Sequence, residues 1–123
     1  LVTDWSFANE VPLCQIQVRR EVLPYSINLN CMSTEEGGLY LSCSFCDNKR
    51  WSGLVVNDGD IRIRLNEIVY PVQATRVTDP LELDRAWEAR VIKLQVHNSE
   101  VNPAVPLGTP RPDRWWSFHL ESR

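Results

Sequence analysis

Two β-forming runs at residues 61–65 (IRIRL) and 68–74 (IVYPVQA) constrain the fold more than any other feature of the sequence. The strict alternation of the first run is typical of a strand with one buried face, so its aliphatic residues should face a core and its arginines solvent. Asn66 and Glu67, between the runs, are enough for a hairpin turn. Pro71 has no backbone N–H to donate, which predicts an edge position or a bulge for the second strand.

Further strands are predicted upstream of this hairpin. Residues 13–34 are rich in β-forming residues and read as two strands, broken near Arg20 or at Pro24. The turn signal at residues 35–38 (EEGG) is followed by a short apolar run at residues 39–43 (LYLSC), which predicts another hairpin. The N-terminal half of the chain is therefore expected to be antiparallel β structure.

Two helices and a closing strand complete the predicted elements. Apolar residues at helical spacing between residues 49 and 56 predict a short helix. Asp79 can cap a longer helix of about four turns, for which Pro80 suits the first position. The four prolines of residues 98–112 exclude continuous regular structure and predict an ordered loop or a mobile arm. Residues 114–121 read as a final strand, and the apolar stripe of the longer helix is Leu83, Trp87, Val91 and Leu94.

Length and composition limit the classes of protein to which the chain can belong. A chain of 123 residues with 43% hydrophobic and 24% charged residues predicts one globular domain, residues 1–123. The formal net charge of −3 argues against a nucleic-acid partner, and no run approaches the ~20 apolar residues of a membrane span. We expect a small antiparallel barrel with helical decoration, located in the cytoplasm.

The segment CSFCDNKRW, residues 43–51, allows two interpretations, of which the first is a thiol or metal site. Cys43 and Cys46 have the C-x-x-C spacing of redox pairs and of half a zinc site. A redox pair of the thioredoxin kind would need a βαβ context, and zinc would need a second close pair of ligands. Neither is present, so we predict no metal site and expect buried, reduced thiols at all four cysteines.

The second interpretation of the same segment is an anion-binding turn. Lys49 and Arg50 are adjacent cations at a strand-to-helix junction, where free backbone N–H groups could join them in holding a phosphate. A solvated surface pair is the alternative for such a dipeptide. Arg62 and Arg64 could extend the patch or could form the solvent side of their strand.

Acid–base and nucleophilic catalysis find no support in the sequence. The two histidines, His97 and His119, are far apart in the chain, and no nucleophile motif is present. Catalytic residues therefore stay unassigned.

The ordered series of elements carries more information than any single motif. The run GGLYLSCSFCDNKRWSGLVVNDGDIRIRLNEIVYPVQATRVTD, residues 37–79, resembles the FMN-binding split-barrel superfamily, the pyridoxamine-phosphate-oxidase-like proteins. The resemblance covers roughly residues 22–95. It implies a mainly β (α+β) fold, a six-stranded antiparallel split barrel with one longer and one or two short helices. It also implies a homodimer that binds FMN between subunits and acts as an oxidoreductase on a small molecule.

The resemblance also implies which residues contact the cofactor. The phosphate ligands would be Arg50 first and Lys49 second, with Ser42 and Ser44 lining the same pocket and Trp51 or Trp115 near the flavin ring. In the C-terminal pattern W-x-x-x-R-L-x-P, Trp115 and Leu120 match, but His119 replaces the arginine and Ser122 the proline. Residues 26–30 (SINLN) are uncharged where many members have a basic phosphate ligand. The alternative is a non-catalytic split barrel that binds haem, a deazaflavin or a phosphorylated metabolite, or that binds no cofactor.

Overall fold

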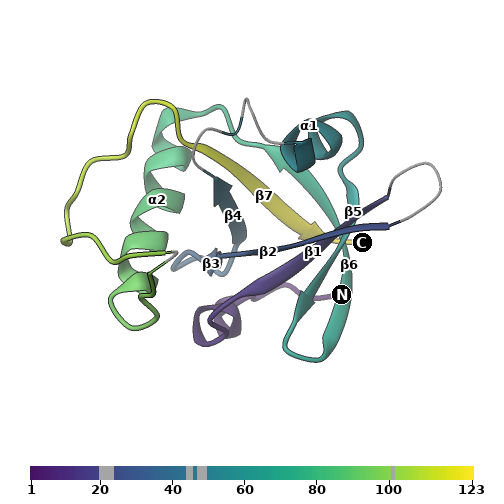
Figure 1. Ribbon diagram of the computed structural model, residues 1–123, viewed down its shortest axis with the longest axis horizontal. Helices are drawn as coiled ribbons and strands as arrows, with labels where there is room; N and C mark the ends of the chain where they lie inside the picture. The colour runs from purple at the N-terminus through teal and green to yellow at the C-terminus, as the bar shows by residue number, and fades with distance from the viewer. Residues whose placement is uncertain (20–23, 44–45, 47–49, 101) are drawn as a thin grey trace.

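One antiparallel sheet of seven strands, in the order β2-β1-β5-β6-β7-β4-β3, forms the framework of the protein (Figure 1). The structure is a computed structural model that describes residues 1–19, 24–43, 46, 50–100 and 102–123. The sheet curls into a nearly closed barrel. Its two outermost strands, β2 and β3, are consecutive in the chain. The strands are β1 (Cys14–Arg19), β2 (Pro24–Leu29), β3 (Cys31–Ser33), β4 (Leu39–Cys43), β5 (Asp60–Leu65), β6 (Ile68–Arg76) and β7 (Trp116–Ser122).

The mainly β, antiparallel barrel is confirmed, but the number of strands is seven and not the predicted six. The extra strand arises because the chain changes partner at Asn30. Residues 24–29 pair with β1, whereas residues 31–33 pair with β4. Asn30 lies between the two strands and is only 6% exposed. A stretch that reads as one strand in the sequence therefore contributes to both ends of the sheet.

The β5–β6 hairpin has the burial pattern that its alternation predicts. Ile61, Ile63 and Leu65 are at most 2% exposed, while the intervening arginines face outward. Asn66 takes the left-handed conformation in the turn, with φ of 57°, which asparagine tolerates better than most residues.

The expected edge position of Pro71 is wrong. The strand that contains it, β6, lies between β5 and β7 in the interior of the sheet, and its pairing with β5 is continuous. The pairing of β6 with β7 begins only at Val72, so Pro71 lies just beyond the end of β7. Arg123, the residue after β7, donates its backbone N–H to the Pro71 carbonyl at 3.1 Å, so this end of the ladder uses the acceptor of Pro71 and loses little from its missing N–H.

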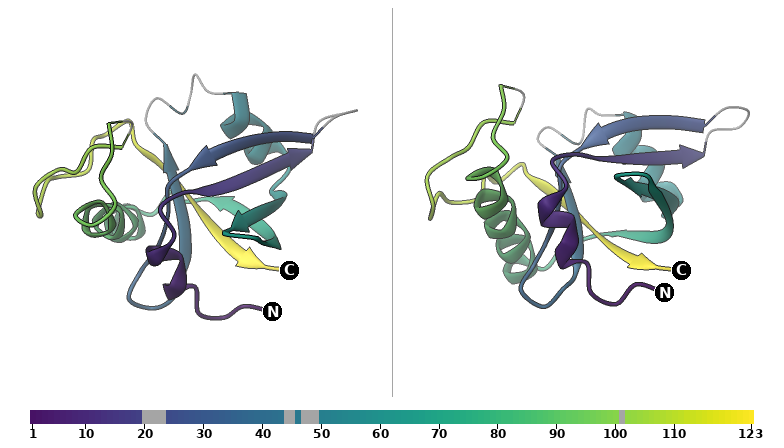
Figure 2. Two further views of the ribbon diagram at one scale, coloured as in Figure 1. Left: turned by 60° about the horizontal axis from the view of Figure 1, so that its bottom comes forward. Right: turned by 90° about the horizontal axis from the view of Figure 1, so that it is seen from below.

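In the part of the chain that the structure describes, three helices cover the barrel: η1 (Ser6–Glu10), α1 (Arg50–Asn57) and α2 (Pro80–Leu94). Both α-helices are predicted by the sequence, and the side chain of Asp79 accepts a hydrogen bond from the Glu82 N–H as expected of a cap. The first turn of α1 inserts Trp51 into the core, whereas α2 packs on the outer face of β3 and β4. The two α-helices lie on opposite sides of the molecule in every view (Figure 2). No helix among the described residues is long and apolar enough to cross a membrane.

The proline-rich segment is fixed against α2. Trp87 Nε1 donates to the carbonyl of Thr109 at 2.7 Å, and Gln95 Nε2 donates to the carbonyl of Val105 at 2.7 Å. Two further side chains, Arg111 and Asp84, form an ion pair at 2.9 Å. Of the two predicted possibilities, the described part of this segment is therefore the ordered loop.

The four cysteines are paired, so the expectation of reduced thiols is wrong. A disulfide joins Cys14 to Cys31, whose Cα atoms are 5.8 Å apart, and another joins Cys43 to Cys46, at 5.6 Å. Both separations are within the ordinary range for disulfides. The β1–β2 register explains the first pair, because it places Cys14 opposite Leu29, two residues before Cys31.

Candidate functional site

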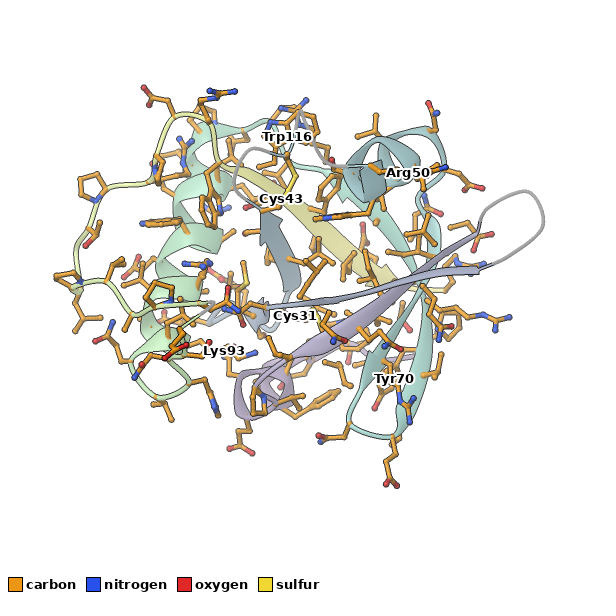
Figure 3. The ribbon with its side chains drawn as sticks, viewed as in Figure 1. Cys31, Cys43, Arg50, Tyr70, Lys93 and Trp116 are labelled. Atoms are coloured by element: carbon orange, nitrogen blue, oxygen red, sulfur yellow. A yellow bond between two sulfur atoms is a disulfide. The ribbon has the colours of Figure 1, made fainter. Side chains whose placement is uncertain are left out.

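Arg50 is the first residue of α1, the helix that follows β4 and the C-x-x-C segment (Figure 3). Its side chain is exposed and makes no hydrogen bond or ion pair with another described residue. A helix start offers backbone N–H groups without helical acceptors, so a cation at this position suits an anion such as phosphate. The other predicted residues of this junction, Lys49 and Ser44, lie outside the described residues.

The outer face of β4 and β7 brings together two more of the predicted residues. Ser42 lies opposite Ser117 in the β4–β7 register, and their hydroxyl groups share a hydrogen bond of 2.8 Å. Two register positions away, on the same face, His119 stacks on the ring of Tyr40 with centroids 4.8 Å apart. This face therefore carries polar and aromatic groups, in contrast to the wholly apolar inner face of the same strands.

Tyr40 links this face to α2. Its hydroxyl donates to Glu82 Oε2 at 2.7 Å. Burial, with this hydrogen bond and the negative charge of Glu82, raises the pKa of Tyr40 well above its ordinary value. The phenol is therefore neutral over the whole physiological range, and it acts as a fixed hydrogen-bond donor.

The two predicted tryptophans have different surroundings. Trp51 is 1% exposed and contacts Phe118 in the core, with ring centroids 5.7 Å apart. Trp115 lies on the outside, edge-on to Trp87 at 4.8 Å and under the guanidinium of Arg90 at 4.6 Å. Contact of either ring with a cofactor stays a prediction, and Trp115 is on the same face as Ser42 and His119.

Sequence reasoning missed two buried cations on α2. Lys93 is 3% exposed, and its Nζ donates to the carbonyl oxygens of Ala8, at 3.1 Å, and Cys31. Burial lowers the pKa of Lys93 to about 8, and it also lowers the pKa of Arg90, which is 9% exposed. In the sequence, Arg90 follows Trp87 by three residues and Lys93 precedes Leu94, so both border the apolar stripe of the helix, a position that does not by itself indicate burial.

A shallow hollow of about 260 Å³ lies on the outside of β1 and β5. Arg64 lines it, and its Nε donates to the carbonyl of Asn66 at 3.0 Å. None of the predicted cofactor residues is among its lining residues, which are Val11, Pro12, Leu13, Cys14, Gln15, Asn28, Arg64 and Asn66. Arg64 therefore belongs to a separate feature of the surface.

No protein-family model matches the sequence, and no curated protein matches it. Solved structures do resemble the fold. A candidate pyridoxamine 5′-phosphate oxidase of Listeria innocua superposes with a TM-score of 0.66 at 10% identity, over 94% of this chain and 87% of the other. The chain has the split-barrel fold of the pyridoxamine 5′-phosphate oxidase-like proteins.

Other solved structures resemble it to a similar degree. A FAD-binding protein of Mesorhizobium loti superposes with a TM-score of 0.63 at 11% identity, covering 94% of this chain and 87% of its own. A conserved hypothetical protein of Mycobacterium tuberculosis gives a TM-score of 0.69 at 10% identity, covering 95% of this chain and 76% of its own. At such identities the likeness concerns the fold alone.

Proposed function

We propose that this split barrel binds FMN and works as an FMN-dependent oxidoreductase on a small molecule, as a homodimer with the cofactor between subunits. The observation that carries the proposal is the position of Arg50. The residue that the family resemblance assigns to the FMN phosphate is an exposed arginine without a described partner, at the start of a helix. The likeness in fold to a FAD-binding protein and to a candidate pyridoxamine 5′-phosphate oxidase supports the same proposal.

The residues at and near this junction fit a flavin nucleotide in kind. Arg50, with Lys49, would neutralise the phosphate, and the N–H groups at the start of α1 would add hydrogen bonds. On the outer face of β4 and β7, the hydroxyl of Ser42 and the ring of Trp115 would contact the less charged part of the nucleotide. The flavin would supply hydride or electron transfer, and the protein would bind it, orient it and limit the access of water.

Retention of FMN by the purified protein tests this proposal. We expect visible flavin absorption after incubation with FMN and gel filtration, together with a rise in melting temperature, since a ligand that binds only the folded state stabilises it. Arg50→Ala should lose both effects. Arg62→Ala is the matched control, because it removes an exposed arginine from β5 and should retain both.

The wild-type protein decides the outcome. If it retains no flavin and shows no thermal shift, the FMN proposal is wrong, and a split barrel with another ligand becomes the hypothesis to examine. Light scattering coupled to the gel filtration tests the homodimer separately, since a mass equal to one chain at micromolar concentration contradicts it.

A further inference from the structure

Two cations are buried within one turn of α2, Arg90 at 9% exposed and Lys93 at 3% exposed. No carboxylate among the described residues pairs with either of them. Of the acids on α2 itself, Asp84 pairs with Arg111, Glu82 accepts from Tyr40, and Glu88 is exposed. Buried charges are ordinarily paired, because removing a charge from water without compensation costs several kcal/mol. The positive charge under α2 therefore needs an explanation.

Hydrogen bonding distinguishes the two residues. The ammonium group of Lys93 has hydrogen-bond acceptors for two of its three donors, because its Nζ donates to the carbonyls of Ala8 and Cys31. Arg90 makes no hydrogen bond or ion pair with a described residue. Its guanidinium carbon lies 4.6 Å from the centroid of the Trp115 ring and 5.6 Å from that of Trp87. Stacking on aromatic faces leaves the in-plane N–H groups of a guanidinium free to donate, in the fork arrangement that matches an oxyanion.

Two further buried polar side chains lack hydrogen-bond partners in the part of the chain that the structure describes. They are the Nε1 of Trp115, whose ring stacks on Arg90, and both amide atoms of Asn30. Asn30 directly precedes Cys31, whose carbonyl accepts from Lys93, one turn along α2 from Arg90. The alternation of β3 places Cys31 in the barrel core and Met32 under α2, so Asn30 comes out on the α2 side. Buried polar groups without partners are rare in native proteins, and a bound water or ion is one explanation for them.

We propose that Arg90, Trp115 and Asn30 form an anion-binding site beneath α2, which takes the oxyanion group of a small carboxylate or phosphate. The guanidinium would bind two oxygen atoms of the anion, and the indole and amide N–H groups would complete its hydrogen bonds. The site goes beyond the proposed flavin-phosphate site. It shares Trp115 with the proposed flavin contacts, but its cation differs, because Arg50 begins α1, on the other side of the molecule from α2 (Figure 2).

The indole N–H of Trp115 reports directly on this site. In ¹⁵N-labelled protein, its NMR signal is identified as the indole signal that Trp115→Phe removes. Sodium phosphate and sodium acetate are titrated separately, with sodium chloride at equal ionic strength as the blank. We expect a saturable shift of this signal with at least one of the two anions, and the anion that gives it tells whether phosphate or carboxylate is preferred.

Variants connect the signal to the guanidinium. Arg90→Gln should raise the dissociation constant of the anion by about tenfold or more, as expected for the loss of one charge-assisted contact. Arg76→Gln is the matched control, because the guanidinium of Arg76 also stacks on a tryptophan, 3.4 Å from the Trp116 centroid, but its side chain is exposed. Arg76→Gln should leave the anion affinity unchanged. Arg50→Ala should also leave it unchanged, so a failure of the flavin proposal and a failure of this one can be told apart.

Two results would overturn the inference. One is the absence of a saturable shift in the wild-type protein up to roughly 100 mM of either anion, a concentration far above the millimolar dissociation constant of a weak specific site. The other is a shift that persists at full affinity in folded Arg90→Gln. If this variant does not fold, Asn30→Ala replaces it and should lower the affinity for the anion severalfold. Unchanged affinity in Asn30→Ala would then contradict the site.

Discussion

Lys93 should make the stability of the protein increase with pH above neutrality. Its pKa is about 8 in the folded protein, against 10.5 for an ordinary lysine, because burial disfavours the charged amine. Between these two values the unfolded chain binds more protons than the folded protein, so the free energy of unfolding rises with pH. Below pH 8 the amine is charged in both states, and the folded protein bears the full cost of a buried cation. At 1.36 kcal/mol for each unit by which the two pKa values differ, that cost is about 3 kcal/mol.

Lys93→Met removes the titrating group and keeps a long side chain in its place. The variant also loses the hydrogen bonds to the carbonyls of Ala8 and Cys31, which adds an offset that does not depend on pH. We expect the free energy of unfolding of the wild type, minus that of the variant, to grow by about 3 kcal/mol from about pH 7 to 10.5.

Urea denaturation at a series of pH values measures this difference. The raised pKa of Tyr40 makes the folded state lose stability above pH 10, but it does so equally in both proteins and cancels in the subtraction. Thiol exchange does not interfere at high pH, since none of the cysteines is free. A difference that stays constant to within about 0.5 kcal/mol over this range, which is close to the precision of linear extrapolation, refutes the reasoning.

Two further predictions concern cross-links in the fold. Replacing Cys14 and Cys31 by alanine opens a loop of 17 residues and should lower the free energy of unfolding by about 3 kcal/mol. Urea denaturation measures this loss, and an unchanged midpoint would show that the bridge contributes nothing. Trp87→Phe removes the donor to Thr109, so it should lower the free energy of unfolding by about 1 kcal/mol and expose residues 102–112 to proteases. Trp115→Phe should lower it by less, because the indole N–H of Trp115 has no partner among the described residues. The reverse order of the two losses would contradict the assigned bond.

The elements that the sequence predicts correctly are those specified by near neighbours in the chain. The alternation at residues 61–65 needs only one buried face to define a strand, and Asp79 caps α2 through a residue three positions away. Apart from the Cys43–Cys46 bridge, which joins residues three positions apart, the corrections depend on strands that are distant in sequence. The position of Pro71 follows from where β7 ends, and the Cys14–Cys31 bridge follows from the β1–β2 register. Neither can be read from a local pattern.

The candidate sites divide in the same way. Arg50 could be predicted because a strand, a basic turn and a short helix follow one another directly in the sequence. Arg90 could not, because its burial results from contact between α2 and residues that immediately precede the last strand, such as Trp115. In the sequence, an arginine beside an apolar stripe is interpreted as a residue at the solvent-exposed edge of an amphipathic helix. Arg90 is buried only because the segment that contains Trp115 packs over it.

The position of β7 has a consequence for how the protein is made. This strand follows every other element in the chain, yet it lies in the interior of the sheet, between β4 and β6. A nascent chain on the ribosome therefore presents two open strand edges until residues 116–122 have emerged, and such edges readily pair with other chains. Closure of the barrel must therefore wait until residues 116–122 have left the ribosome.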